Sequence, residues 1–232
     1  MNALNAELLE RLIGALDDAQ AQGCSALILS GRPGMFTAGL DVPELIRLDR
    51  AEMRRHWKIF FDSQARLASY PMPVVAAITG HSPAGGAVLA LYCDYRIMAA
   101  GNFRIGLNEV QVGLFPGPII YGALRRLVGP RVADRLICGG VLLSPDEAQA
   151  VGLVDRVVGA DAVVTAALEW ARYMSSLPRL AMTRTRALAR ADLIALVANL
   201  SEGDYQSMTD AWFSDETQTT LRQLVERLQA KR

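Results

Sequence analysis

The sequence predicts an α/β fold followed by a mostly helical region. In the first half, short β-branched and aliphatic runs alternate with segments whose apolar residues recur at helical spacing. In the second half, helix-start signals and apolar stripes dominate. The composition changes near Gly139 and Gly140, so we divide the chain into an α/β core at 1–140 and a helical C-terminal region at 141–232.

The first predicted element is a helix over residues 4–20, with Gly23 as its stop. A short buried strand over 26–29 follows and ends in a loop at 30–34. The apolar positions that define the helix are Leu4, Leu8, Leu12, Ala15, Leu16 and Ala19.

A second buried strand is predicted over residues 74–78, after the turn residues Pro71 and Pro73. It continues into a glycine-containing loop and then into a helix over 87–92. Residues 95–98 predict a third strand.

The second half contains two clear helix starts. Ser144 followed by Pro145 and two acidic residues predicts a capped helix, which Gly152 closes. The last helix begins at 214–216 and has one apolar stripe, which must pack on its own core or on a neighbouring subunit. The stripe consists of Leu221, Leu224, Val225 and Leu228.

The composition excludes several protein classes. The chain has 232 residues, of which 51% are hydrophobic and 21% are charged, so a largely disordered protein is excluded. A chain of this length needs no disulfide or metal to stabilise its core. Twenty-four basic and 24 acidic residues give zero net charge, which argues against a nucleic-acid partner.

The three cysteines, Cys24, Cys93 and Cys138, form no metal-ligand spacing and lie among apolar residues. We therefore expect buried, reduced thiols and no metal site. The N-terminus does not resemble a signal peptide, and no apolar run approaches the roughly 18 residues of a membrane span. We expect a soluble cytoplasmic protein of bacterial type without a membrane partner, although a mitochondrial matrix location stays open because a removed transit peptide leaves no trace.

Two loops that follow buried strands are candidates for presenting backbone N–H groups to a ligand. Residues 36–41 contain the small pair Ala38 and Gly39, and residues 83–86 place two glycines at a helix start. Free N–H groups there suit a developing negative charge. Neither loop has a dinucleotide-binding or Walker pattern, and each alone is also compatible with a plain structural turn.

Glu109 is the main candidate for acid–base chemistry. It lies in the apolar, glycine-punctuated segment 105–117, where burial would raise its pKa toward neutrality and let it accept and return a proton. A surface carboxylate or half of a structural ion pair is the alternative. His56 is interpreted as a helix-surface residue, and His81 as a loop residue near the site without an assigned role.

Several spaced segments resemble the crotonase (enoyl-CoA hydratase/isomerase) superfamily. They are residues 30–41, 83–86 and 93–97, and residues 105–109 and 213–228 are similar more narrowly to Δ3,Δ2-enoyl-CoA isomerases. The resemblance covers essentially the whole chain. It implies a crotonase-type ββα spiral core with a helical C-terminal oligomerisation region, assembled as a homotrimer or a dimer of trimers.

The resemblance also implies the site. An acyl-CoA thioester would bind with its carbonyl oxygen between the Ala38 and Gly85 N–H groups, and Glu109 would be the catalytic base. Coenzyme A is then part of the substrate and no separate cofactor is expected. The remaining residues expected at the substrate, some of them near the CoA adenine, are Phe36, Thr37, Gly39, Leu40, Asp41, Gly86, Val88, Leu114 and Phe115.

The carboxylates decide which reaction the resemblance implies. Family hydratases hold a water between two glutamates, and the second would fall at position 88, which is Val88 here. One carboxylate suits a 1,3-proton shift in a 3-enoyl-CoA during fatty-acid β-oxidation, with Val88 keeping water out. Gly117 stands where dienoyl-CoA isomerases have an aspartate, which argues against that activity.

Other functions remain open at this point. An enoyl-CoA hydratase or another acyl-CoA enzyme with one carboxylate is the enzymatic alternative, and an RNA-binding or inactive relative is the other. Family members usually begin with a strand pair before the segment that matches residues 2–5. Either the start site is short or the sheet has lost an edge, and a lost edge would expose unpaired backbone, which bears on stability more than on chemistry.

Overall fold

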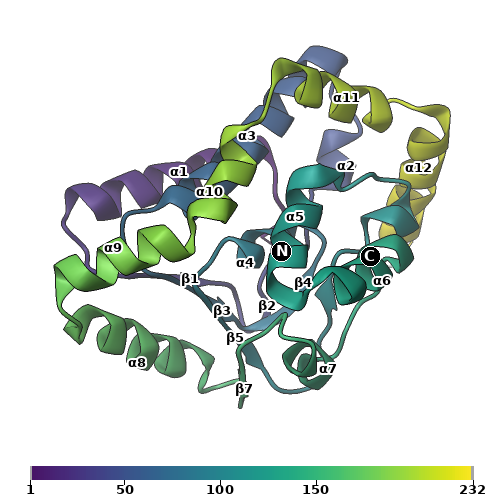
Figure 1. Cartoon of the computed structure of the whole chain (residues 1–232). Helices are drawn as coiled ribbons and strands as arrows, with labels where there is room; N and C mark the ends of the chain where they lie inside the picture. The colour runs from purple at the N-terminus through teal and green to yellow at the C-terminus, as the bar shows by residue number, and fades with distance from the viewer. Residues whose placement is uncertain (1, 231–232) are drawn as a thin grey trace.

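Two parallel β-sheets form the centre of the molecule in a computed structural model that describes residues 2–230 (Figure 1). The larger sheet has the strand order β1-β3-β5-β7, and the smaller one has the order β2-β4-β6. The larger sheet comprises β1 (Leu27–Ser30), β3 (Val74–Ile78), β5 (Tyr95–Ala99) and β7 (Arg156–Val158). The smaller sheet comprises β2 (Gly34–Met35), β4 (Gly80–Pro83) and β6 (Ile105–Gly106).

The chain alternates between these sheets in ββα repeats. Each of β1, β3 and β5 is followed within a few residues by a strand of the smaller sheet, and then by helices that return the chain to the larger sheet. This is the ββα spiral that the resemblance implies. The helices of the core are α1 (Ala6–Ala21), α2 (Val42–Leu45), α3 (Arg50–Ser69), α4 (Gly85–Leu91), η1 (Glu109–Val112, a 3-10 helix), α5 (Gly117–Val128) and α6 (Pro130–Gly139).

The central strand β3 shows why the sequence forms a sheet covered on both faces. All five of its residues are buried. Val74, Ala76 and Ile78 belong to the main hydrophobic core, whereas Val75 and Ala77 pack in a second cluster with α8 (Val163–Ser176). A parallel strand buried on both faces needs a continuous apolar run, which is the pattern that predicted it.

Helix α3 forms much of the opposite layer (Figure 1). It begins at a capping box in which Asp49 accepts a hydrogen bond from the Glu52 N–H and Glu52 accepts one from the Asp49 N–H. Its apolar face includes Trp57 and Phe60, and it packs against α1, α10 (Ala191–Ala198) and α11 (Glu202–Trp212). The aromatic side chains of α3 pack against the C-terminal helices, with the ring centroids of Trp57 and Trp212 5.9 Å apart.

A buried ion-pair cluster attaches the C-terminal helices to the core. Asp94 accepts hydrogen bonds from Arg186 at 2.8 Å and from Arg190 at 3.1 Å. Arg190 also donates to the carbonyls of Leu67 and Tyr92. These charge-assisted bonds fix α9 (Arg179–Ala189) and α10 against α3 and α4.

The predicted elements of the first half are confirmed with shifts of one or two residues at their ends, and the Ser144 and Ser214 caps are present. The helices that follow these caps are α7 (Pro145–Ala150) and α12 (Asp215–Gln229). The strand β7 was missed, because three residues are too short to give a pattern. It lies within 141–232 yet pairs with β5, and the division at residue 140 stays a prediction.

Three local expectations were wrong. Cys24 and Cys138 are exposed, and only Cys93 is buried, although none of the three forms a disulfide. His56 is buried on α3 between aromatic neighbours, Trp57 and Phe60, instead of lying on the surface. Burial lowers the pKa of His56 to about 4, which keeps the imidazole neutral in this apolar setting.

Strands β1 and β7 form the two edges of the larger sheet. Among residues 2–230, no helix is long and apolar enough to span a membrane.

Candidate active site

A cavity of about 750 Å³ lies between α2, α3, the start of α4, η1 and the last two helices. Seven of the residues expected at the substrate line it. Five of these seven come from the two glycine loops and η1, which are distant in sequence and adjacent in the fold. The seven are Ala38, Leu40, Asp41, Gly85, Glu109, Leu114 and Phe115.

The two glycine loops touch each other at the cavity wall. A Cβ placed on Gly39 would lie 3.4 Å from the Gly85 nitrogen. Within residues 2–230, neither the Ala38 N–H nor the Gly85 N–H donates a hydrogen bond to another protein group. The cavity is therefore lined, on one side, by two neighbouring backbone donors that can receive an oxygen atom.

Ala84 holds the second loop in an unusual conformation. Its φ of 47° and ψ of −119° are rare for a residue with a Cβ, and its carbonyl accepts the Val88 N–H as α4 begins. Such strain costs on the order of 1–3 kcal/mol and persists only where the surroundings enforce it. Here the Ala84 N–H donates to the Gly106 carbonyl at 2.8 Å, which ties the turn to β6.

Glu109 is the first residue of η1 and is 7% exposed. Burial raises the pKa of its carboxyl to about 7, while a hydrogen bond from its own backbone N–H lowers it slightly. Its Oε2 atom is buried without a hydrogen-bond partner among residues 2–230. A carboxyl group in this state can both remove and return a proton near neutral pH.

Helix α12 supports η1 from outside. The Thr217 hydroxyl donates a hydrogen bond to the carbonyl of Gly113 at 2.5 Å, and Gly113 is the residue that ends the helix begun by Glu109. Leu221 of the apolar stripe is fully buried, and Leu224 and Leu228 line the cavity. Leu221, Leu224 and Val225 thus pack on their own chain, which was one of the two expected outcomes, whereas Leu228 is 40% exposed.

The inner wall of the cavity is apolar, and sequence analysis missed most of it. Trp57 and Phe60 come from α3, Ile120 from α5 and Met208 from α11, and all four are buried. In the segment that forms α3, only His56 was interpreted from the sequence, and none of its apolar residues was assigned to the site. No sequence pattern distinguishes a side chain that fills a core from one that lines a cavity.

The other expected site residues lie behind the cavity wall and do not line it. The Thr37 hydroxyl accepts the Gly39 N–H at 3.1 Å and so shapes the first loop. Phe36 is buried in the main core, and a Cβ on Gly86 would lie 2.8 Å from the Thr37 side chain. Phe36, Thr37, Gly39 and Gly86 therefore surround the backbone donors at short range.

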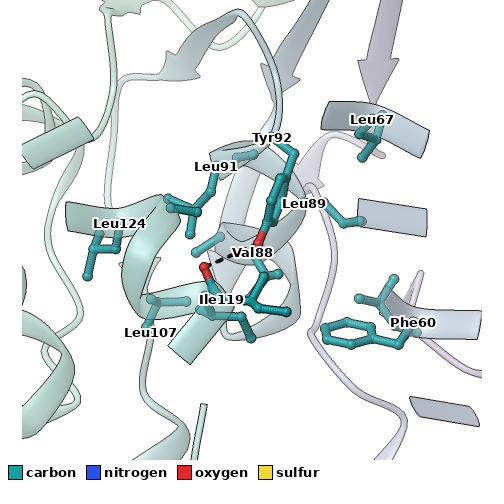
Figure 2. Packing of buried hydrophobic residues seen from close by; sticks show 14 of the residues in the cluster. Phe60, Leu67, Val88, Leu89, Leu91, Tyr92, Leu107, Ile119 and Leu124 are labelled. Carbon is teal, nitrogen blue, oxygen red and sulfur yellow. Dashed lines mark hydrogen bonds between the residues drawn. The ribbon is translucent and has the colours of Figure 1, made fainter. Parts of the chain in front are cut away.

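Val88 is fully buried on α4 and packs within the main core. Figure 2 shows it beside Ile119, whose carbonyl accepts the Tyr92 hydroxyl at 3.5 Å. Its role as a wall against water stays a prediction. Position 88 carries no group able to hold or deprotonate water.

Polar side chains line the solvent-facing end of the cavity. Asp41, Arg47 and Gln229 line the cavity there, and Arg47 and Gln229 are exposed. Asp41 also caps α2 by accepting the Glu44 N–H at 3.3 Å. Among residues 2–230, no three His, Cys, Asp or Glu side chains come together in a way that could hold a metal ion.

The sequence profile described as Enoyl-CoA hydratase/isomerase matches residues 1–231. The chain belongs to the enoyl-CoA hydratase/isomerase family. Over the full chain it is 33% identical to human mitochondrial enoyl-CoA delta isomerase 1, of which the match covers 78%. It is also 36% identical to a probable enoyl-CoA hydratase, EchA17 of Mycobacterium avium, over 80% of this chain and 72% of that protein.

Solved structures of the family share this fold. The human mitochondrial Δ3-Δ2-enoyl-CoA isomerase superposes with a TM-score of 0.94 over 100% of this chain and 91% of its own, at 33% identity. The enoyl-CoA hydratase EchA3 of Mycobacterium ulcerans superposes with a TM-score of 0.83 at 26% identity, over 91% of each chain. The crotonase-type fold is thus confirmed, and relatives of the family carry both isomerase and hydratase names.

Proposed function

We propose that this enoyl-CoA hydratase/isomerase family member converts a 3-enoyl-CoA into the trans-2-enoyl-CoA, as a Δ3,Δ2-enoyl-CoA isomerase in fatty-acid β-oxidation. One observation carries the proposal. Glu109 is the buried carboxylate of the cavity lining, the Ala38 and Gly85 N–H groups that line the same cavity have no hydrogen-bond acceptor within residues 2–230, and position 88 carries a buried valine.

The reaction needs one group that takes a proton and gives it back. Glu109 removes a proton from C2, and the electron pair of that C–H bond moves into the thioester as a dienolate. Its protonated carboxyl then returns the proton to C4, so the double bond moves from C3–C4 to C2–C3 and the mass is unchanged. A pKa of about 7 suits both steps, since neither protonation state is strongly favoured.

The dienolate carries its charge on the thioester oxygen. The Ala38 and Gly85 N–H groups would receive that oxygen, and each such donor is typically worth about 3 kcal/mol in the transition state. Contact between the two loops keeps their spacing constant, so little reorganisation is needed when charge develops.

Hydration is the alternative, because relatives include probable hydratases. It requires a water held and activated next to C3. Asp41 is the other carboxylate among the residues that line the cavity, but it is half-buried at the outer end and caps α2. A single inner carboxylate therefore favours proton transfer over addition of water.

In the deciding experiment, the purified protein is incubated with a 3-enoyl-CoA, and the product is followed by mass spectrometry and ultraviolet absorbance. We expect an unchanged mass and a new conjugated-enoyl absorbance. A mass gain of one water would establish a hydratase instead. The variant Glu109→Gln should lower kcat by at least about 1,000-fold, with binding of a saturated acyl-CoA retained, whereas retained turnover would remove Glu109 from the mechanism.

We further propose assembly as a homotrimer or a dimer of trimers. The apolar stripe of α12 gives little support, since three of its four residues pack within the chain. Support comes from exposed apolar side chains on α8 and α9: Val164 and Leu168 share one face, and Leu180 and Leu188 are 64% and 79% exposed.

A further inference from the structure

We propose that Met208 closes the acyl end of the cavity and sets the longest acyl chain that the site accepts. The inference rests on the proposed function for its ligand, an acyl-CoA thioester, and adds the residue that determines chain length. It starts from a second, smaller hollow on the far side of the Met208 side chain.

The direction of the ligand follows from the chemistry of the walls. The Ala38 and Gly85 N–H groups and Glu109 hold the thioester end. Exposed Arg47 and Gln229 lie at the solvent-facing opening of the cavity, where a polar CoA moiety would lie. Among the apolar lining residues, Trp57, Phe60 and Met208 are buried, and the wall they form suits a hydrocarbon chain.

Helices α3 and α11 supply the walls for that chain. Trp57 and Phe60 on α3 and Met208 on α11 are 4%, 3% and 8% exposed. Helices α3 and α11 are in contact, so the cavity ends against their packed side chains. A chain that extends away from Glu109 along these walls meets Met208.

A hollow of about 40 Å³ begins beyond this point, between α11 and the start of α5. Phe115 and Met208 line both this hollow and the main cavity. Phe115 is 57% exposed and Ser207 is also exposed, so the hollow reaches the outer surface. Met208 is the buried partition between the two spaces.

Met208 faces a residue that has no side chain. A Cβ added to Gly117 would lie 3.5 Å from the Met208 sulfur, so the thioether is separated from the first residue of α5 by no more than the space of a methyl group. Methionine is unbranched and flexible and can be displaced more easily than a branched side chain. Shortening it would join the hollow to the cavity without disturbing Glu109 or the two loops.

The test measures binding of saturated acyl-CoA thioesters from butanoyl to hexadecanoyl by titration calorimetry. In the unmodified protein, affinity should rise with chain length and then stop rising. In Met208→Ala the rise should continue for about two to four further carbons, with the longest chains bound about tenfold more tightly or better. Met208→Phe should stop the rise at a shorter chain.

Two controls separate a joined cavity from a loosened protein. Met72→Ala removes the same atoms from an equally buried methionine that lines neither space, and its profile should match the unmodified protein. Adding Ser207→Phe to Met208→Ala fills the hollow from the surface and should reverse the gain. An unchanged profile in both Met208 variants, or an equal shift in Met72→Ala, would overturn the proposal.

The 3-enoyl-CoA assay is run on the same samples so that the two proposals fail separately. A shifted binding profile without isomerisation would refute the isomerase and keep Met208 as the chain-length residue. If the protein isomerises 3-enoyl-CoA but the chain-length profile is the same in all variants, only the proposed role of Met208 is refuted. If no acyl-CoA binds at any length, both proposals are wrong.

Discussion

A Cβ on Gly85 would lie 3.4 Å from the Gly39 Cα, so the loops that carry the two expected oxyanion donors are separated at this point by no more than the space of a methyl group. Gly39 has a φ of +80°, and a Cβ there would approach the Ala84 Cβ to 3.1 Å. The position of the Ala38 N–H therefore depends on a glycine next to it and on a strained alanine across from it.

Substitution of Gly39 tests this dependence. Gly39→Ala should cost about 1–2 kcal/mol of unfolding free energy because of its positive φ and should lower kcat about 10- to 100-fold by displacing the Ala38 N–H. Gly23→Ala is the matched control, since Gly23 also has a positive φ but nothing lies within 4 Å of its Cβ position. Equal effects of the two variants on kcat would contradict a role for the loop contact.

The pH dependence of turnover should report Glu109. The carboxylate form takes the C2 proton, so kcat/KM should be low at pH 5, rise through an apparent pKa of about 7, and level off above it. Steady-state rates between pH 5 and 9 measure this. A profile that is flat across pH 6–8 would show that another group controls the proton transfer.

Glu109 should also make the protein less stable as pH rises. Burial raises its pKa from the ordinary value of 4.5 to about 7, so the native state binds the proton more tightly than the unfolded state. The unfolding free energy therefore falls by about 3 kcal/mol as the pH rises between these two values. Glu109→Gln does not titrate, so urea unfolding should show it gaining up to that amount over the unmodified protein above pH 7.

The control for this stability prediction is Glu169→Gln, which changes an exposed carboxylate on α8. It reports what the loss of one surface carboxylate does to stability over the same pH range, and the gain of Glu109→Gln should exceed it. A constant difference for Glu109→Gln would mean that Glu109 is not buried in solution.

Val88→Glu tests whether a second carboxylate alone makes a hydratase. Val88 is fully buried beside Ile119 (Figure 2), so a charged group there should destabilise the fold by at least about 3 kcal/mol. We expect no rise in isomerisation and at most a trace of hydration. Val88→Ala leaves only a small void and should keep isomerisation within a few-fold. A large rise in isomerisation by Val88→Glu would contradict the expected role of Val88.

The oligomeric state can be tested on α9. Light scattering coupled to size exclusion should give a mass of three or six chains for the unmodified protein. Leu180→Glu combined with Leu188→Glu should reduce it, because charge would enter an apolar contact between subunits. Thr219→Glu changes an exposed position on α12 and should not alter the mass. A monomer in the unmodified protein would refute the trimer.

Sequence patterns predicted the elements whose residues carry a local signal. The continuous apolar run at 74–78 identified β3, and the Ser144 and Ser214 caps identified the starts of α7 and α12. The glycine loops and Glu109 were found because small residues and an isolated carboxylate stand out in apolar surroundings. The prediction of a single catalytic carboxylate came from the resemblance, which identified position 88 as the place of the second glutamate in hydratases.

Only the tertiary structure decided which side chains share the site. Burial of His56 and exposure of Cys24 follow from which helix packs where, and three residues of β7 join the sheet because β5 offers its free edge. The same holds for Met208, because its place beside the start of α5 depends on how α11 packs. Local sequence sets the conformation of each segment, whereas a cavity is what remains between segments once their packing is complete.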